Sequence, residues 1–363
     1  MKHRRERGIL KEYKEQIMAV DGVVSCGLMQ QRGRPTVHVT MLKGYSRDKI
    51  PQRIRNLDII VDYVDELPEP LLQATIARYQ SRNRPVQPGH QIRTDIGNGS
   101  VGFMIHHEGA DYLITAAHLM TEWSRGKVIG QHTRADMNHI ANLHTWINIY
   151  GYPFHIGGPG DMMSFKLQHH VPVTNKPMDR VGSAPTQLST FKPTQVLEPD
   201  IGMQTVSFGR TTGIKYNEIV EVDTTVRLLG VGDKPQWTCG NVFLLKYTAS
   251  MMGDSGGGIF CLNPPGVLGV CVHSRGGCNA TDGLEYLGFG RYPTLTDNRE
   301  TVVELTIGEK TILVNGQPRQ IDIPPRIEEG RTLLELRGIG EALGARFDYE
   351  PKDAPVQKVY IYR

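Results

Sequence analysis

GDSGG, at residues 253–257, is the stretch of this 363-residue chain that decides its expected fold and chemistry. Glycines on both sides let the backbone turn tightly and expose the Ser255 hydroxyl. The N–H groups of Gly253 and Ser255 can point at one spot, and paired donors of this kind stabilise the oxyanion of a tetrahedral intermediate. A plain glycine-rich turn has the same spacing. The interpretation of Ser255 as a nucleophile therefore depends on a base and an acid elsewhere in the chain.

The base is expected to be a histidine, because a serine hydroxyl is a weak nucleophile unless an imidazole takes its proton. The run LITAAH at residues 113–118 consists of an apolar strand, two alanines and His118. Such a strand would present the ring at the edge of a β-barrel. A structural histidine after a strand is the alternative, and His106 and His107 are the nearest competitors. The pairing with the serine motif favours His118 as the base.

The third member must be a carboxylate that orients the imidazole without taking its proton. The run GDMMSFKL at residues 160–167 places Asp161 at the head of a mostly apolar strand, between His118 and Ser255 in the chain. An ordinary turn aspartate is the alternative interpretation, and Asp136 and Asp179 are weaker candidates.

These three segments, in the order His, Asp, Ser, resemble the chymotrypsin/trypsin family of serine peptidases. The order argues against an α/β-hydrolase, which uses Ser, then an acid, then His on a βαβ framework. GRTTG at residues 209–213 resembles the second barrel of bacterial trypsin-like proteins, and residues 20–64 resemble a small domain that precedes the protease in some of them. The resemblance implies a mainly β fold, a chymotrypsin-like double β-barrel flanked by small α+β domains at both ends.

The activity that the resemblance implies is that of a serine endopeptidase. Ser255 would attack a peptide carbonyl, His118 would transfer protons, Asp161 would orient His118, and the N–H groups of Gly253 and Ser255 would bind the oxyanion. No metal and no cofactor is required, and the expected partner is a protein or peptide substrate. Two alternatives stay open: a weakly active or inactive protease fold that serves as a binding or assembly module, and a protease that processes itself.

The resemblance also bears on substrate specificity. Ala249 lies six positions before the serine, where trypsin-like enzymes carry the acid that selects Arg or Lys, so the P1 specificity is not expected to be trypsin-like. An uncharged floor with Met251 and Met252 nearby indicates an apolar or small side chain. His273 lies near the expected pocket wall and could accept an acidic or amide side chain, unless it is a surface histidine at a strand end. The expected substrate pocket comprises Ala249, Met252 and His273.

Cysteine usage and the start of the chain indicate a reducing compartment. The five cysteines form no CxxC pair and no zinc-like spacing. Where the secreted family usually carries disulfide cysteines, next to the histidine and four before the serine, this chain has Leu119 and Met251. The first residues lack the apolar core of a secretory signal, and no stretch approaches the roughly 18 apolar residues of a membrane span. A cytoplasmic location is expected, with non-standard export or a phage origin as alternatives.

Composition and length describe a folded, turn-rich protein of several domains. The chain is 39% hydrophobic and 22% charged, with 40 Gly and 22 Pro. Its net charge of +3 is small, and the basic residues near the start are interleaved with Glu6 and Glu12, so nucleic-acid binding has little support. A chain of 363 residues exceeds the usual size of one core, which predicts two or three domains.

Changes in composition and in hydrophobic periodicity along the chain predict four segments. Residues 1–66 form a small α+β domain, with a helix over 9–19 and strands over 36–41 and 57–64, and residues 67–99 are a linker or wrapping segment. Residues 100–297 are the protease domain, and residues 300–363 form another α+β module. That module is similar to the copper amine oxidase N-terminal-like domain, an accessory module of Gram-positive-type bacterial proteins. The name does not imply copper, because no histidine or cysteine follows Cys278. The terminal domains are candidate sites for a protein or cell-envelope partner.

Overall fold

The computed structural model describes residues 3–68, 85–94, 98–119, 128–131, 138–147, 160–168, 171–176, 180–181, 184–185, 188, 191–228, 237–251, 253–296, 303–314, 317–329, 331–342, 346–350 and 358–362. The chain divides into two compact units. The first unit comprises Met1–Asn83, Gln87–Leu167 and Asn175–Asp297, and the second comprises Arg84–Val86, Gln168–Thr174 and Asn298–Arg363.

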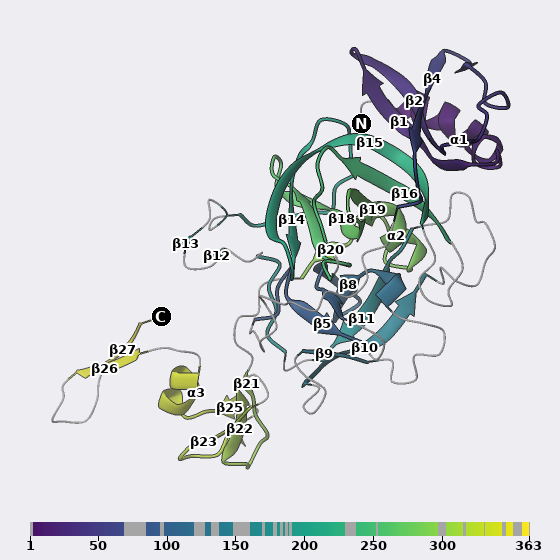
Figure 1. Ribbon diagram of the computed structural model, residues 1–363. Helices are drawn as coiled ribbons and strands as arrows, with labels where there is room; N and C mark the ends of the chain where they lie inside the picture. The colour runs from purple at the N-terminus through teal and green to yellow at the C-terminus, as the bar shows by residue number, and fades with distance from the viewer. Residues whose placement is uncertain are drawn as a thin grey trace. The chain divides into compact units, whose positions relative to one another are not determined.

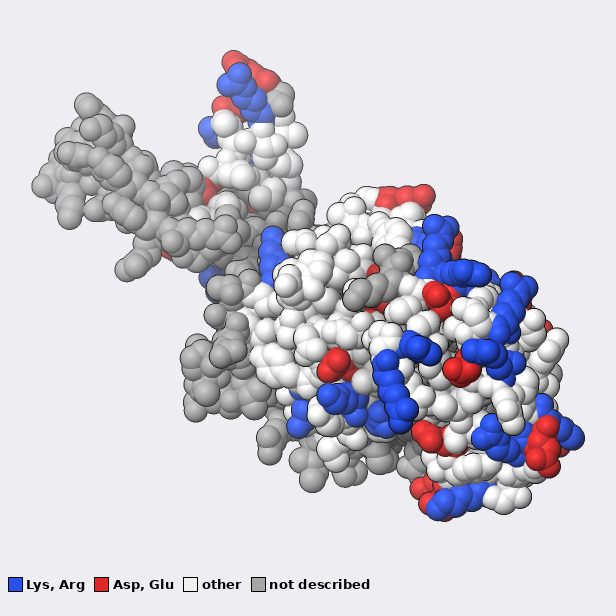
Figure 2. All heavy atoms as spheres, turned by 90° about the horizontal axis from the view of Figure 1, so that it is seen from above, with Lys and Arg blue, Asp and Glu red and all other residues white. Residues whose placement is uncertain are grey.

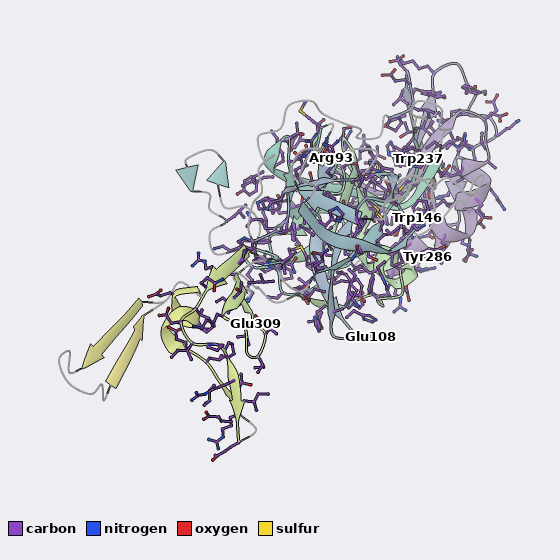
Figure 3. All side chains as sticks on the ribbon, turned by 90° about the horizontal axis from the view of Figure 1, so that it is seen from below. Arg93, Glu108, Trp146, Trp237, Tyr286 and Glu309 are labelled. Carbon is purple, nitrogen blue, oxygen red and sulfur yellow. The ribbon has the colours of Figure 1, made fainter. Side chains whose placement is uncertain are left out.

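The first sheet of the first unit has eight strands in the order β20-β7-β8-β11-β10-β9-β5-β6, all antiparallel to their neighbours. Its strands are β5 (Gln91–Arg93), β6 (Asn98–Ser100), β7 (Phe103–His107), β8 (Ala110–Thr115), β9 (Val128–Gln131), β10 (Asn138–Trp146), β11 (Met163–Leu167) and β20 (Thr294–Leu295). β7 and β8 form a tight hairpin, because Glu108, labelled in Figure 3, and Gly109 both have positive φ. Thr115 at the end of β8 pairs with Met163 at the start of β11. This register brings the residues that follow β8 next to those that precede β11.

Six strands of the second sheet close into a barrel in the order β14-β17-β18-β19-β16-β15, because β14 also pairs with β15. They are β14 (Gln204–Gly209), β15 (Gly213–Leu228), β16 (Trp237–Leu245), β17 (Gly258–Cys261), β18 (Gly266–His273) and β19 (Gly276–Asn279). Figure 1 shows these strands curving around a common axis. Closure leaves no strand of the ring with an unpaired edge. The predicted mainly β fold is confirmed.

One hydrophobic core joins the first sheet to the barrel. Phe103 and Ile114 of the first sheet belong to the same buried cluster as Phe208 and Phe260 of the barrel. Because protein cores pack as densely as organic crystals, a shared core fixes the two sheets against each other. Groups that come from different sheets can therefore meet with a defined geometry.

The N-terminal segment extends the barrel sheet. It consists of α1 (Arg4–Met18), β1 (Val23–Gln31), β2 (Arg34–Leu42), β3 (Arg53–Ile54) and β4 (Leu57–Val64), so the predicted helix and both predicted strands are present. β1 pairs with β15 in antiparallel fashion, with Ser25 opposite Val226, and β2 pairs with β4 in parallel. α1 buries Leu10 and Met18 in a cluster that also contains Ile219 of the barrel. The segment and the barrel thus share both a sheet and a core.

Two short helices complete the first unit. The 3₁₀ helix η1 (Ala117–Leu119) follows β8, and α2 (Ala280–Tyr286) follows β19. Asn279 caps α2, since its side chain accepts a hydrogen bond from the Thr281 N–H at 3.0 Å. A further hairpin consists of β12 (Arg180–Val181) and β13 (Ala184–Pro185).

The second unit contains short hairpins and one helix. Its elements are β21 (Val303–Glu304), β22 (Thr311–Val314), β23 (Gln317–Gln320), β24 (Arg326–Glu328), β25 (Arg331–Leu333), α3 (Leu336–Ala342), β26 (Arg346–Glu350) and β27 (Lys358–Tyr362). Its buried cluster consists of Ile312, Val314 and Ile321, with Ile339 of α3 packed against it.

Charges of both signs share the surface. On the face seen in Figure 2, Lys and Arg side chains are interspersed with Asp and Glu. Within the described part of the chain, we find no helix whose length and apolar character would let it span a membrane.

Candidate active site

Ser255 lies in a tight loop between β16 and β17. Gly253 and Gly256 on either side have positive φ, 95° and 78°, which favours glycine. A side chain at Gly256 would also collide with Thr115 Oγ1 at the end of β8. The two turns of the loop are closed by bonds from Asp254 N to Met251 O (2.9 Å) and from Gly257 N to Asp254 O (2.8 Å). The predicted role of the flanking glycines therefore has a geometric basis.

The carboxylate of Asp254 fixes this loop to the barrel. Its Oδ1 accepts hydrogen bonds from the N–H groups of Thr211 (2.6 Å) and Thr212 (3.2 Å), and its Oδ2 accepts one from Met251 N (2.9 Å). Asp254 is fully buried, and backbone donors of this kind compensate a buried charge. The predicted GRTTG segment, residues 209–213, thus contacts the serine loop directly.

Arg210 holds the loop from a second direction. It is the largest fully buried side chain among the described residues, and burial lowers the pKa of its guanidinium. Its Nε donates to the Gly253 carbonyl oxygen at 3.0 Å, and the Ser100 hydroxyl donates to the same oxygen at 3.1 Å. Nη1 of Arg210 donates to Gln91 Oε1 at 3.1 Å. Two donors on one carbonyl fix the orientation of the Gly253 backbone.

His118 links the serine loop to the first sheet. It lies in η1, directly after β8, and its Nε2 is hydrogen bonded to Ser255 Oγ. Its Nδ1 is hydrogen bonded to Asp161 Oδ2, and its backbone N–H donates to Asp161 Oδ1 at 2.8 Å. Because a carboxylate can only accept, Nδ1 carries the proton and Nε2 is left to accept from the serine hydroxyl.

Asp161 completes this chain of hydrogen bonds. It follows Gly160, whose φ is 102°, and lies two residues before β11. The side chains of Asp161, His118 and Ser255 are all fully buried. The structure thus brings the three predicted residues together. The pairing of β8 with β11 places His118 beside Asp161, and the serine loop brings Ser255 to His118.

The competing candidates are elsewhere. His106 pairs with Asp111 at 2.8 Å and is about half exposed, and His107 packs edge-on against Phe289 at 5.3 Å between ring centroids. Asp136 and Asp179 lie outside the described residues.

Trp237 is an addition that sequence reasoning missed. This residue begins β16 and is labelled in Figure 3, and its ring stacks on the His118 imidazole with centroids 6.0 Å apart and planes 26° apart. It is buried, and no local motif marks it. Its position depends on the pairing of β16 with β15 and β19, which a single run of sequence does not reveal.

The predicted pocket residues lie on two neighbouring segments. Ala249 is buried, and its N–H donates to Ser274 O at 2.8 Å, while Ser250 Oγ donates to His273 O at 3.0 Å. The segment before the serine loop therefore lies against the end of β18. Met252 lies outside the described residues.

His273 is buried, so the interpretation of it as a surface histidine is wrong. Burial lowers its pKa to about 4, with a smaller contribution from Arg275, so the ring is neutral near pH 7. Its Nδ1 accepts from the Arg275 N–H at 3.4 Å, which leaves the proton on Nε2. Nε2 is buried and has no hydrogen-bond partner among the described residues.

Metal-ligating side chains do not gather in the part of the chain that the structure describes. No group of three or more His, Cys, Asp or Glu residues there is arranged to hold a metal ion. All five cysteines are buried and free.

Comparisons with known proteins agree with the two predicted resemblances. Residues 293–358 match the family model of the copper amine oxidase N-terminal domain. Similar solved structures include a glutamic acid-specific serine protease described as using a histidine triad in substrate binding, with 19% identity and a TM-score of 0.42 over 58% of this chain and 100% of that one. They also include Thermobifida fusca protease A and Nocardiopsis protease, each with 17% identity and a TM-score of 0.41, covering 58% of this chain and 98% and 99% of theirs.

The chain is similar to bacterial chymotrypsin-like serine proteases. No curated protein matches it. Identities of this size do not establish an activity, which must follow from the atoms of the site.

Proposed function

We propose that the protein is a serine endopeptidase. The observation that carries the proposal is the line of hydrogen bonds from Ser255 Oγ through His118 to Asp161. As Ser255 Oγ attacks a peptide carbonyl carbon, its proton passes to His118 Nε2, and Asp161 stabilises the imidazolium without taking a proton. His118 then gives the proton to the leaving amine. A water molecule, deprotonated by His118, releases the acyl group and restores Ser255.

The oxyanion of each tetrahedral intermediate is bound by the N–H groups of Gly253 and Ser255. Support for this role comes from the two donors on the Gly253 carbonyl, Arg210 Nε and Ser100 Oγ, which hold the peptide unit that lies between the two N–H groups. Donors that are already oriented cost no reorganisation during the reaction. Removing one oxyanion donor typically lowers kcat by about 10²–10³.

The pocket selects a P1 side chain that carries an oxygen acceptor, as in glutamate or glutamine. Ala249 offers no charge to a lysine or arginine, which argues against trypsin-like specificity. Buried, neutral His273 has a proton on Nε2 without a partner among the described residues, and an unpaired buried donor costs about 1–3 kcal/mol. A carboxylate or carboxamide oxygen would accept from it.

A fluorophosphonate probe tests the chemistry. The wild-type protein should be labelled, and Ser255→Ala should abolish labelling with the folded structure retained. His118→Ala should slow it by about 10³ or more. Wild-type protein that is folded but not labelled would instead favour the alternative, a protease fold that binds a partner without turnover.

Peptides that differ only at P1 then test the pocket: glutamate and glutamine should be cleaved fastest. His273→Ala should remove that preference while probe labelling continues, and a preference for lysine or arginine would refute the assignment.

Self-processing is a narrower version of the same activity. Incubating the wild-type and Ser255→Ala proteins side by side distinguishes self-processing from cleavage of other substrates. In self-processing, only the wild type would fragment, and peptides added to it would remain intact.

A further inference from the structure

The backbone of Asp161 is held by a thiol. The Asp161 N–H donates a hydrogen bond to Cys278 Sγ at 3.3 Å. The preceding Gly160 lies against the same sulfur, and any side chain at Gly160 would collide with it. Both carboxylate oxygens of Asp161 are occupied by His118. The sulfur therefore supports Asp161 at its backbone, while His118 contacts its carboxylate.

Cys278 belongs to the barrel, whereas Asp161 leads into the first sheet. Cys278 lies on β19 and is paired on both sides, with Val242 of β16 and with Val270 of β18. A residue in the middle of a sheet with two ladder neighbours is rigidly placed. The contact between Asp161 and Cys278 is thus a joint between the sheet that carries His118 and the barrel that carries Ser255.

The chemistry of the thiol suits a passive support. Cys278 is fully buried, and burial raises the pKa of its thiol, so it is uncharged near pH 7. Its S–H is directed to Asn279 O at 3.9 Å, and a sulfur lone pair remains for the Asp161 N–H. A neutral acceptor holds the backbone without adding a second negative charge beside the carboxylate.

We propose that Cys278 is a positioning residue for Asp161, setting the place of the carboxylate that orients His118. This inference rests on the proposed serine endopeptidase function. Catalytic groups must be held within about 0.5 Å of their productive geometry, and here they come from two different sheets. Cys278 does not touch the reacting atoms and acts only through Asp161.

The test compares Cys278→Ala, which removes the acceptor, with Cys278→Ser, which keeps one. The control is Cys239→Ala: Cys239 is buried in the same cluster, but its sulfur is directed to Gly240 O at 3.8 Å. Cys278→Ala should lower kcat by about 10–100-fold with KM changed by less than about threefold, since small misplacements cost this much. Cys278→Ser should recover most of the loss. Cys239→Ala should lower the melting temperature by a similar amount to Cys278→Ala and leave kcat within about twofold, as expected for lost packing alone.

A second measurement does not need turnover. The low-field ¹H NMR resonance of the His118 Nδ1 proton reports its bond to Asp161, and it should shift or broaden in Cys278→Ala but not in Cys239→Ala. Equal kcat values for Cys278→Ala and Cys239→Ala, or an unchanged resonance, would overturn the positioning role.

If Cys278→Ala does not fold, Cys278→Ser carries the test. Wild-type kcat and an unchanged resonance in Cys278→Ser support the role, and loss of both refutes it, because an acceptor is still present at position 278. Failure of the wild type to react with the fluorophosphonate would contradict the proposed function, and the NMR comparison would still test the contact.

Discussion

The two ends of the chain are built in different ways. At the N-terminal end, β1 continues the barrel sheet through β15, and Leu10 of α1 is buried in the same cluster as Phe243 of the barrel. The C-terminal module has its own small cluster of three buried residues, Ile312, Val314 and Ile321, and belongs to a separate compact unit. Both ends look like accessory α+β modules in sequence, but the first shares a sheet and a hydrophobic core with the barrel.

The N-terminal segment is therefore a structural part of the barrel, whereas the C-terminal module has a buried cluster of its own. Removing a segment that shares a core uncovers apolar surface and breaks a sheet, whereas the buried cluster of the C-terminal module, Ile312, Val314 and Ile321, lies within that module. The comparison can be tested by changes whose expected effects run from loss of the fold to a shift in pH dependence.

Deletion of residues 1–66 should have the largest effect. It leaves β15 without its β1 partner and exposes the cluster around Ile219 and Phe243, so we expect aggregation and no fluorophosphonate labelling. The matched deletion of residues 300–363 should keep labelling within about twofold of the full chain. Size-exclusion chromatography and labelling rates check both. A soluble, reactive protein without residues 1–66 would remove the distinction between the two ends.

Arg7→Ala should have the second-largest effect, a loss of stability. The Arg7 side chain, only 11% exposed, contacts Glu198 at 3.2 Å, Asp200 at 3.5 Å and Asp223 at 3.3 Å. Removing it leaves three carboxylates close together and poorly solvated, which should lower the free energy of unfolding by about 3 kcal/mol. Urea unfolding at pH 7 measures this.

Arg55→Ala is the control for that experiment. Arg55 pairs with Glu12 at 2.7 Å on the same N-terminal segment, but both side chains are more than half exposed. Its unfolding midpoint should match that of the wild type, because exposed ion pairs contribute little. Equal losses in both variants would mean that the buried ion pairs do not join α1 to the barrel.

His38→Gln should have the smallest effect, visible mainly through pH. Burial alone would lower the pKa of His38, but bonds to Glu221 (2.6 Å) and Asp62 (3.1 Å) raise it to about 9. A base with a raised folded-state pKa stabilises the fold fully below its ordinary pKa of about 6.5, and this stabilisation is lost as pH rises through about 9. We expect the wild type to lose about 2 kcal/mol between pH 6.5 and pH 9.5 beyond what His38→Gln loses.

Unfolding free energies at the two pH values provide the measurement. His106→Gln, whose ring is about half exposed, is the control and should follow the wild-type pH dependence. Parallel curves for wild type and His38→Gln would show that the Glu221 contact contributes nothing to the joint between β2 and β15.

The three residues that the structure brings together, Ser255, His118 and Asp161, carry local signals in the sequence. Ser255 lies between turn-forming glycines, His118 ends an apolar strand, and Asp161 begins one, so each could be recognised from its own neighbours. The mainly β class followed from short alternating runs for the same reason.

The supports of the site could not be predicted in this way. Cys278 meets Asp161 across 117 residues, and Arg210 meets Gly253 across 43. These contacts depend on strand order and register, which no short window contains. The sequence left open whether His273 is buried, because residues 249–250, which contact the end of β18, lie far from it in the sequence. For the same reason, residues 1–66 were expected to be a separate domain, with no pairing to the barrel foreseen.

The pairing of Ser25 with Val226 has a consequence for biosynthesis. The first partner leaves the ribosome about 200 residues before the second, which at roughly 5–20 residues per second is a wait of about 10–40 s. During that time β1 has an open edge and α1 covers only part of its eventual core. Pairings of such long range fold slowly, because loop closure comes before any gain from contact. A nascent chain therefore cannot complete the sheet that joins the N-terminal segment to the barrel until β15 has emerged, when translation is well advanced.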